Sequence, residues 1–139
     1  MADSFKFELV SPERLLVSEE VSQVLIPGAE GEMTVMPDHA PVMTTVRPGI
    51  VTITTATGAV ESYVVFGGFA DVLPTGCTLL AESAVHVDEA NREDIRARIE
   101  SAREAMQKVE TEKERADLAE YLHQLTTLEN TMVPGQHLV

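Results

Sequence analysis

The sequence is poor in basic residues, cysteine and long apolar runs, and each shortage excludes a class of protein. Ten Lys and Arg stand against 23 Asp and Glu, and the net charge of -13 argues against binding nucleic acid or anionic lipid, which needs a basic face. The single cysteine, Cys77, cannot form an internal disulfide, and the N-terminus shows no apolar signal segment. No apolar run approaches the roughly 20 residues that span a bilayer. We therefore expect a protein of a reducing cytosolic compartment whose contact with any membrane runs through other proteins.

The apolar pattern divides the chain near Val87. Before this point apolar and polar residues alternate with period two, as in residues 5–9 and 51–55, which is typical of half-buried strands. Turn signals recur about every ten residues, which indicates an all-β sandwich or barrel rather than alternating strands and helices. They fall at residues 11–13, 27–28, 37–38, 48–49, 57–58, 67–68 and 74–76. We assign residues 1–87 to a β-sandwich domain.

Residues 88–139 follow a helical period instead. Two sets of apolar residues have the spacing of a helix face: Ile95, Ile99, Ala102, Met106 and Val109, then Leu118, Leu122, Leu125 and Leu128. Thr111 and Glu114 have the spacing of a capping box, which places a break near Glu110. Because each apolar stripe is narrow, we predict an antiparallel two-helix hairpin that packs on the sandwich or on another chain.

Residues 26–41 carry the strongest candidates for a site. Two Pro/Gly turn signals bracket a short strand there, and their tips hold Glu30, Glu32, Asp38 and His39. Loops on a rigid scaffold carry recognition more often than packing. The stretch therefore predicts a loop-borne contact site.

The same residues allow a metal or hydrolytic site, but the pattern for one is incomplete. Asp38 and His39 with the two glutamates supply ligand atoms, yet a second histidine at helix spacing is missing. Cys77 lies in an apolar strand without a basic neighbour, which favours a packed core residue over a nucleophile. Residues 67–68, Gly-Gly, are not followed by Lys-Ser/Thr, so a bulge or close-packing site is favoured over a phosphate loop.

Taken together in chain order, five motifs resemble the epsilon subunit of bacterial rotary ATP synthases. They are Val10-Ser11-Pro12-Glu13, Glu20-Val21, the run from Pro27-Gly28 through Gly31-Glu32 to Pro37-x-His39-Ala40-Pro41, Arg47-Pro48-Gly49, and Gly67-Gly68-Phe69. The resemblance implies a β-sandwich at the foot of the central stalk that contacts the gamma subunit and the rotor ring. It also implies a C-terminal hairpin that, in some members, reaches the catalytic head and blocks ATP hydrolysis.

By this resemblance, Glu32 and His39 face the polar loops of the rotor ring, and Glu30 lies beside them. The plainer interpretation is that both glutamates are solvated hairpin residues and that His39 caps a turn. We expect a non-catalytic coupling subunit, peripheral on the cytoplasmic face of the bacterial inner membrane, with no catalytic residue, metal or cofactor. The alternatives are a free cytosolic nucleotide-sensing β-sandwich module and a small metal-dependent hydrolase.

The resemblance also bears on nucleotide binding. Some epsilon subunits bind ATP through an Ile/Leu-Asp-x-x-Arg-Ala motif on the first helix and arginines on the second. Here Glu93 and Arg96 match the motif loosely, but residues 116–139 contain no Lys or Arg. Because phosphate recognition needs converging cations, we expect weak ATP binding or none. The acidic second helix likewise predicts at most weak inhibition of hydrolysis.

Overall fold

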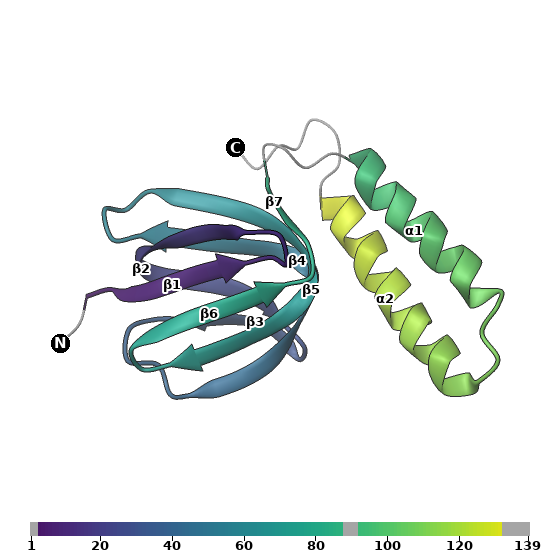
Figure 1. Cartoon of the computed structure of the whole chain (residues 1–139), viewed down its shortest axis with the longest axis horizontal. Helices are drawn as coiled ribbons and strands as arrows, with labels where there is room; N and C mark the ends of the chain where they lie inside the picture. The colour runs from purple at the N-terminus through teal and green to yellow at the C-terminus, as the bar shows by residue number, and fades with distance from the viewer. Residues whose placement is uncertain (1–2, 88–91, 132–139) are drawn as a thin grey trace. The chain divides into compact units, whose positions relative to one another are not determined.

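The computed structural model describes residues 3–87 and 92–131 (Figure 1). Its strands are β1 (Phe5–Val10), β2 (Leu15–Gly28), β3 (Gly31–Val35), β4 (Val42–Thr55), β5 (Val60–Leu73), β6 (Gly76–Ala81) and β7 (Ala84–His86). Its helices are α1 (Arg92–Met106) and α2 (Glu112–Thr131). Contacts divide the chain into two compact units, Met1–Asp88 and Glu89–Val139, and each is described by itself. The predicted boundary between residues 87 and 88 borders residues outside the described part, so it stays a prediction.

Strand pairing closes on itself in the first unit. The order β1-β6-β5-β4-β2 is completed by a further pairing of β1 with β2, while β3 adds to β2 and β7 adds to β5. Strands β2, β4 and β5 have 14 residues each, and β2 pairs first with β1 and then with β3 on the same side. These long strands take part in both layers of a flattened barrel, and the predicted all-β sandwich is confirmed.

The core lies between the layers and follows the predicted alternation. Phe5, Phe7 and Leu9 of β1 are buried, whereas Lys6 between them is exposed. Val51 and Ile53 of β4 are also fully buried, as their period-two spacing predicts. Each such side chain contributes about 1.5 to 3 kcal/mol by leaving water. The alternation thus places alternate residues of β1 and of the second half of β4 in the core and the others on an outer face.

Two predicted turns are wrong, and a third, at residues 27–28, is displaced because these residues end β2 and the turn follows them. Residues 48–49 lie inside β4 and residues 67–68 lie inside β5, and these strands pair with each other on both sides of the two motifs. The β4–β5 register is the same on both sides, but no pair is formed between Val46–Gly68 and Pro48–Phe66, and the β2–β4 register shifts over the same stretch. Proline and glycine mark a bend there because proline lacks an N–H for the ladder and glycine accepts a close neighbour.

Gly68 shows why the bend needs glycine. Its φ is +150°, and a Cβ built on it would lie 2.2 Å from the carbonyl oxygen of Leu80 in β6. No side chain fits at that distance without movement of the β6 backbone. The predicted role of this Gly-Gly pair as a close-packing site is confirmed.

The second unit contains two antiparallel helices. The Thr111 hydroxyl accepts a hydrogen bond from the Glu114 backbone N–H at 3.1 Å, which confirms the predicted N-cap of α2. At the other end of the pair, Arg96 near the start of α1 binds Glu129 near the end of α2. Among the described residues of the unit, the buried ones all belong to the predicted stripes, whose other members are partly buried. The buried ones are Ile95, Ile99, Ala102, Leu125 and Leu128. Within the described residues, neither helix is long and apolar enough to cross a membrane.

We predict that Gly68→Ala destabilises the protein by about 2 to 4 kcal/mol, because the added methyl meets a backbone atom and the φ is strained for alanine. Chemical denaturation measures the change. Gly58→Ala is the matched control: its φ is +95°, but nothing lies within 4 Å of its added Cβ, so it should cost only about 1 kcal/mol. Equal losses in the two variants would contradict the close-packing argument.

Candidate functional site

Glu30 and Glu32 lie at the turn between β2 and β3. Gly28 pairs with Gly31, so the turn itself consists of two residues, Ala29 and Glu30. Glu30 is exposed in the turn, and Glu32 is exposed on β3 opposite Pro27. Two-residue connections between paired strands adopt few conformations. The turn therefore presents two carboxylates on a well-defined support.

His39 lies on the loop that leaves the other end of β3. The last residue of β3, Val35, faces Val24, whereas β4 faces the far end of β2 through its Val46–Gly28 pair. Residues 36–41 must therefore lead from the Val24 end of β2 back past its Gly28 end before β4 begins. Glu32 and His39 are not in one turn: Glu32 lies on β3, and His39 lies on the connection that follows it. We call β3 together with the connections before and after it the β3 edge.

Local hydrogen bonds shape this loop around His39. Asp38 has a positive φ of 63°, and the His39 backbone N–H donates to the Met36 carbonyl oxygen at 3.2 Å. The His39 ring nitrogen Nδ1 lies 2.7 Å from the Ala40 carbonyl oxygen. Because a carbonyl only accepts, Nδ1 must carry the proton in this bond. These bonds agree with the plainer interpretation, in which His39 caps a turn, while the contact with the rotor ring that we expect of it stays a prediction.

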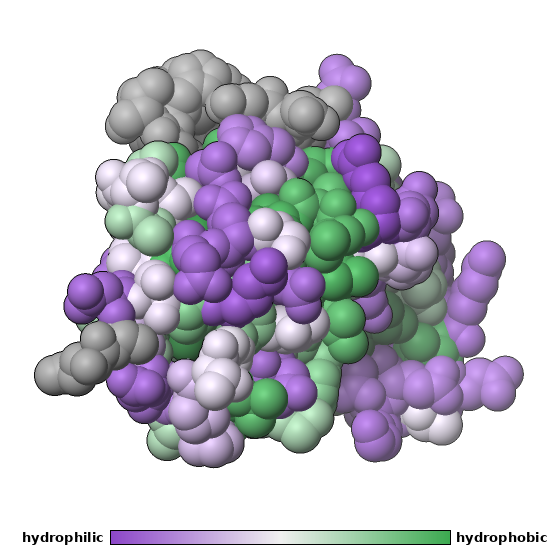
Figure 2. Space-filling view, turned by 60° about the vertical axis from the view of Figure 1, so that its left-hand side comes forward, coloured by the Kyte–Doolittle hydropathy of each residue, from purple (hydrophilic) through white to green (hydrophobic). Residues whose placement is uncertain are grey.

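A second surface feature was not found by sequence reasoning. Leu15, Val10, Leu80, Phe69 and Thr45 pair in that order across β2, β1, β6, β5 and β4, so they form one row on the outer face. Leu15 is 53% and Leu80 is 50% exposed. Figure 2 shows apolar side chains reaching the surface among hydrophilic ones. Contiguous apolar surface of this kind is typical of a protein contact. The row can be recognised only from the cross-strand register, and the register is known only once the strand pairing is known.

Cys77 belongs to the core. It is buried. Burial is the main cause that raises the pKa of its thiol to about 12, and the nearby charge of Asp71 raises it further. The thiol therefore stays protonated at neutral pH, which confirms the interpretation as a packing residue. Among the residues that the structure describes, no group of three or more His, Cys, Asp and Glu side chains could hold a metal ion.

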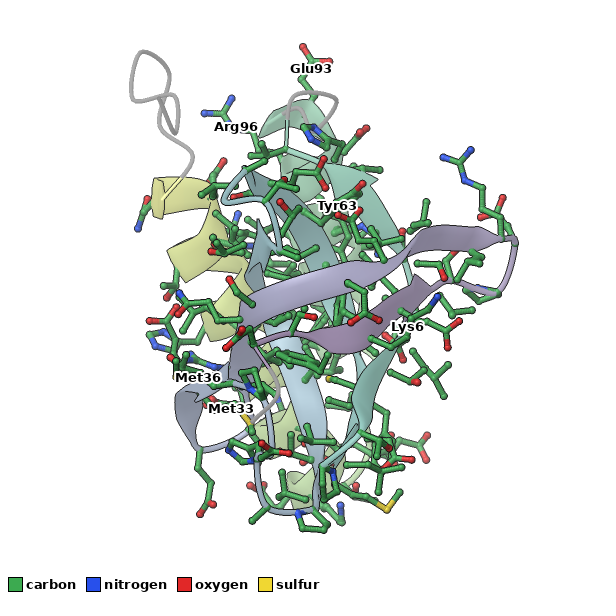
Figure 3. The ribbon with its side chains drawn as sticks, turned by 90° about the vertical axis from the view of Figure 1, so that its left-hand side faces the viewer. Lys6, Met33, Met36, Tyr63, Glu93 and Arg96 are labelled. Atoms are coloured by element: carbon green, nitrogen blue, oxygen red, sulfur yellow. The ribbon has the colours of Figure 1, made fainter. Side chains whose placement is uncertain are left out.

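The two nucleotide candidates lie on α1 (Figure 3). Glu93 is exposed, whereas Arg96 Nε donates to Glu129 Oε2 at 2.7 Å. Glu129 is the more buried partner, with 16% of its side chain exposed against 58% for Arg96. A groove of about 330 Å³ adjoins the pair, lined by Arg96, Ile99, Glu100, Arg103, Thr126 and Glu129. Arg103 in turn binds Glu100 at 3.2 Å, so both guanidinium groups at this groove face carboxylates of the chain itself.

Comparison with known proteins gives the same family along the whole chain. Residues 4–87 match the family model for the ATP synthase delta/epsilon chain, β-sandwich domain. Over 135 residues the chain is 60% identical to the ATP synthase epsilon chain of Mesorhizobium japonicum, an alignment covering 97% of this chain and 100% of the relative. The ATP synthase epsilon chain of Sinorhizobium medicae is 59% identical over 135 residues, an alignment that also covers 97% of this chain and 100% of the relative.

Solved structures agree in fold. A chain in the structure of Euglena gracilis mitochondrial ATP synthase, OSCP/F1/c-ring, superposes with a TM-score of 0.73 at 26% identity, covering 95% of this chain and 83% of that one. A chain of the Tetrahymena thermophila mitochondrial central stalk and c-ring has a TM-score of 0.65 at 14% identity, covering 92% and 95%, which shows likeness of fold alone. The chain therefore belongs to the family of ATP synthase epsilon chains, the non-catalytic stalk subunits of that enzyme.

Proposed function

We propose that this protein couples rotation of the rotor ring to ATP synthesis, as a peripheral stalk subunit of a proton-translocating ATP synthase on the cytoplasmic face of the bacterial inner membrane. Its partners are the gamma subunit and the rotor ring. The observation that carries the proposal is the edge of β3, where Glu30, Glu32 and His39 stand on short, hydrogen-bonded connections. In support, the similar Euglena chain belongs to an assembly that includes F1 and a c-ring.

Polar side chains on rigid connections suit this task. A contact that transmits torque must resist slipping sideways, and many modest polar interactions on a stiff support do so without one strong bond. The apolar part of the row, from Leu15 to Phe69, supplies a second surface on the same unit for a protein partner. Two surfaces on one sandwich are what a subunit between two partners needs.

The helical unit has a smaller part in this proposal. The acidic residues of α2 include Asp117, Glu120 and Glu129, and its last turn holds no basic residue. An acidic helix gains little from acidic partner loops, where like charges at desolvated contacts cost several kcal/mol. We infer at most weak inhibition of ATP hydrolysis through contacts of this unit with the catalytic head.

The first prediction from this proposal concerns the β3 edge. Glu32→Ala with His39→Ala should leave the protein folded, with stability changed by no more than about 0.5 kcal/mol, because both are surface residues. Attachment to the rotor ring should weaken by up to about fivefold, or roughly 1 kcal/mol, as expected for exposed polar contacts. Proton-driven ATP synthesis in membrane vesicles measures the consequence.

A matched control removes the same residue types elsewhere. Glu104→Ala with His123→Ala takes one exposed glutamate and one exposed histidine from the helical unit. This control should synthesise ATP at the parental rate. Unchanged synthesis in a correctly assembled complex carrying the β3-edge variant would count against the interface.

The second prediction concerns ATP, and it separates a coupling subunit from a nucleotide sensor. We expect a Kd poorer than roughly 1 mM, where the binding free energy is about 4 kcal/mol, because Arg96 already binds Glu129. Calorimetric titration of the isolated chain measures it. Glu129→Gln is the informative control, since it removes the competing charge and keeps the side-chain shape. Micromolar binding by the parent chain that disappears in Arg96→Ala would favour the sensor.

The third prediction concerns inhibition. Deleting residues 88–139 should change ATP hydrolysis by the assembled enzyme less than about twofold, which corresponds to about 0.4 kcal/mol in the barrier. The physical reason is the acidic character of α2. Steady-state hydrolysis by matched amounts of assembled complex makes the comparison. A large rise in hydrolysis after the deletion would identify the hairpin as an inhibitor despite its charge.

A further inference from the structure

Arg47 makes a contact inside the sandwich that has no part yet in the proposed coupling function. It lies in β4 just before Pro48, in the stretch where the β2–β4 register shifts. Its guanidinium Nε donates to the carbonyl oxygen of Gly28 at 2.9 Å, in a partly buried position. Gly28 is the last residue of β2 and the residue from which the Ala29-Glu30 turn leaves. The side chain thus joins the bend of β4 to the base of that turn.

The backbone of β4 also packs closely against the residues just before the Ala29-Glu30 turn. A Cβ built on Gly49 would lie 2.8 Å from Cβ of Pro27, so the bend of β4 fits closely against the residue before Gly28. Pro27 and Gly28 are both buried. The base of the turn is therefore bounded by β3 on one side and by residues 47–49 of β4 on the other.

We propose that Arg47 is a positioning residue for the β2–β3 turn: it fixes the direction in which Glu30 and Glu32 are presented to a partner, without contacting the partner itself. The inference rests on the proposed function of the β3 edge. A hydrogen bond from a charged donor is shorter and stronger than a neutral one, and this one acts at the pivot of the turn rather than at its tip. Small changes of angle at the pivot become large displacements of the carboxylates.

The contact atom distinguishes positioning from a charge effect. In arginine, the Nε–H lies three carbons from Cα and points sideways from a planar group, whereas the lysine ammonium lies one carbon farther along a flexible stem. Arg47→Lys keeps the positive charge but moves the donor. If Arg47 acted by attracting an acidic partner, Arg47→Lys would behave like the parent. If Arg47 acts on the Gly28 carbonyl, Arg47→Lys should restore only part of what Arg47→Ala loses.

The first experiment tests the tether in the isolated full chain. Hydrogen exchange of the backbone amides of residues 28–32 is measured in the parent, Arg47→Ala, Arg47→Lys and the control Arg14→Ala, which removes an exposed arginine from another turn of the sandwich. We expect at least fivefold faster exchange in Arg47→Ala, an intermediate rate in Arg47→Lys and less than twofold change in Arg14→Ala. Equal rates in Arg47→Ala and Arg14→Ala would overturn the tether whatever the function of the turn.

The second experiment tests the link to the partner in the assembled complex. The rate of rotor-ring release is compared for Arg47→Ala, Glu32→Ala and the double variant. A positioning residue acts through the turn, so the double variant should release the ring within twofold of the faster single variant. Multiplied effects would show that Arg47 acts independently and would overturn the inference. Normal release in Glu32→Ala would refute the proposed interface, and with it this role of Arg47, while the exchange result on the tether would stand by itself.

Discussion

Three strands of 14 residues must each serve two layers, and the rest of the sandwich depends on how they bend. A straight ladder of that length would leave one layer without a partner on which to bury its apolar face. At residues 46–48 and 66–68 the β4–β5 ladder lacks one pair while the β2–β4 register shifts, which is typical of a bulged strand that bends. Bending in the same place keeps the ladder intact on both sides. The sheet then closes through the pairing of β1 with both β2 and β6.

The bend also determines what stands beside the candidate site. Because β4 bends at residues 47–49, its backbone approaches Pro27 closely and its arginine reaches the Gly28 carbonyl. The bend inside β4 is thereby in direct contact with the base of the surface turn between β2 and β3. Residues 36–41 lead back past the Gly28 end of β2 because β4 starts beyond that end. The two polar connections of the β3 edge are thus consequences of strand geometry.

The sequence predicted those features that depend on near neighbours. Alternation placed Phe5, Phe7 and Leu9 in the core, and the Thr111–Glu114 spacing located the N-cap of α2, because both patterns are complete within a few residues. Pro48-Gly49 was misread as a turn because the same pair suits a turn and a bent strand, and the choice between them is made by β5. The apolar row and the Gly28–Arg47 contact escaped prediction for the same reason: their partners are distant in the sequence.

Arginine side chains have the same kind of partner in both units. Arg47 in the sandwich and Arg96 and Arg103 in the helical unit are engaged by groups of the chain itself, a carbonyl in the first case and carboxylates in the other two. In a chain of ten basic and 23 acidic residues, each such internal contact leaves a larger share of unpaired negative charge for the surface. Exposed carboxylates such as Glu30 and Glu32 keep full hydration until a partner offers cations or hydrogen-bond donors. In the proposed interface at the β3 edge, the cations and hydrogen-bond donors therefore come from the partner, while this chain supplies acceptors on a short, paired turn.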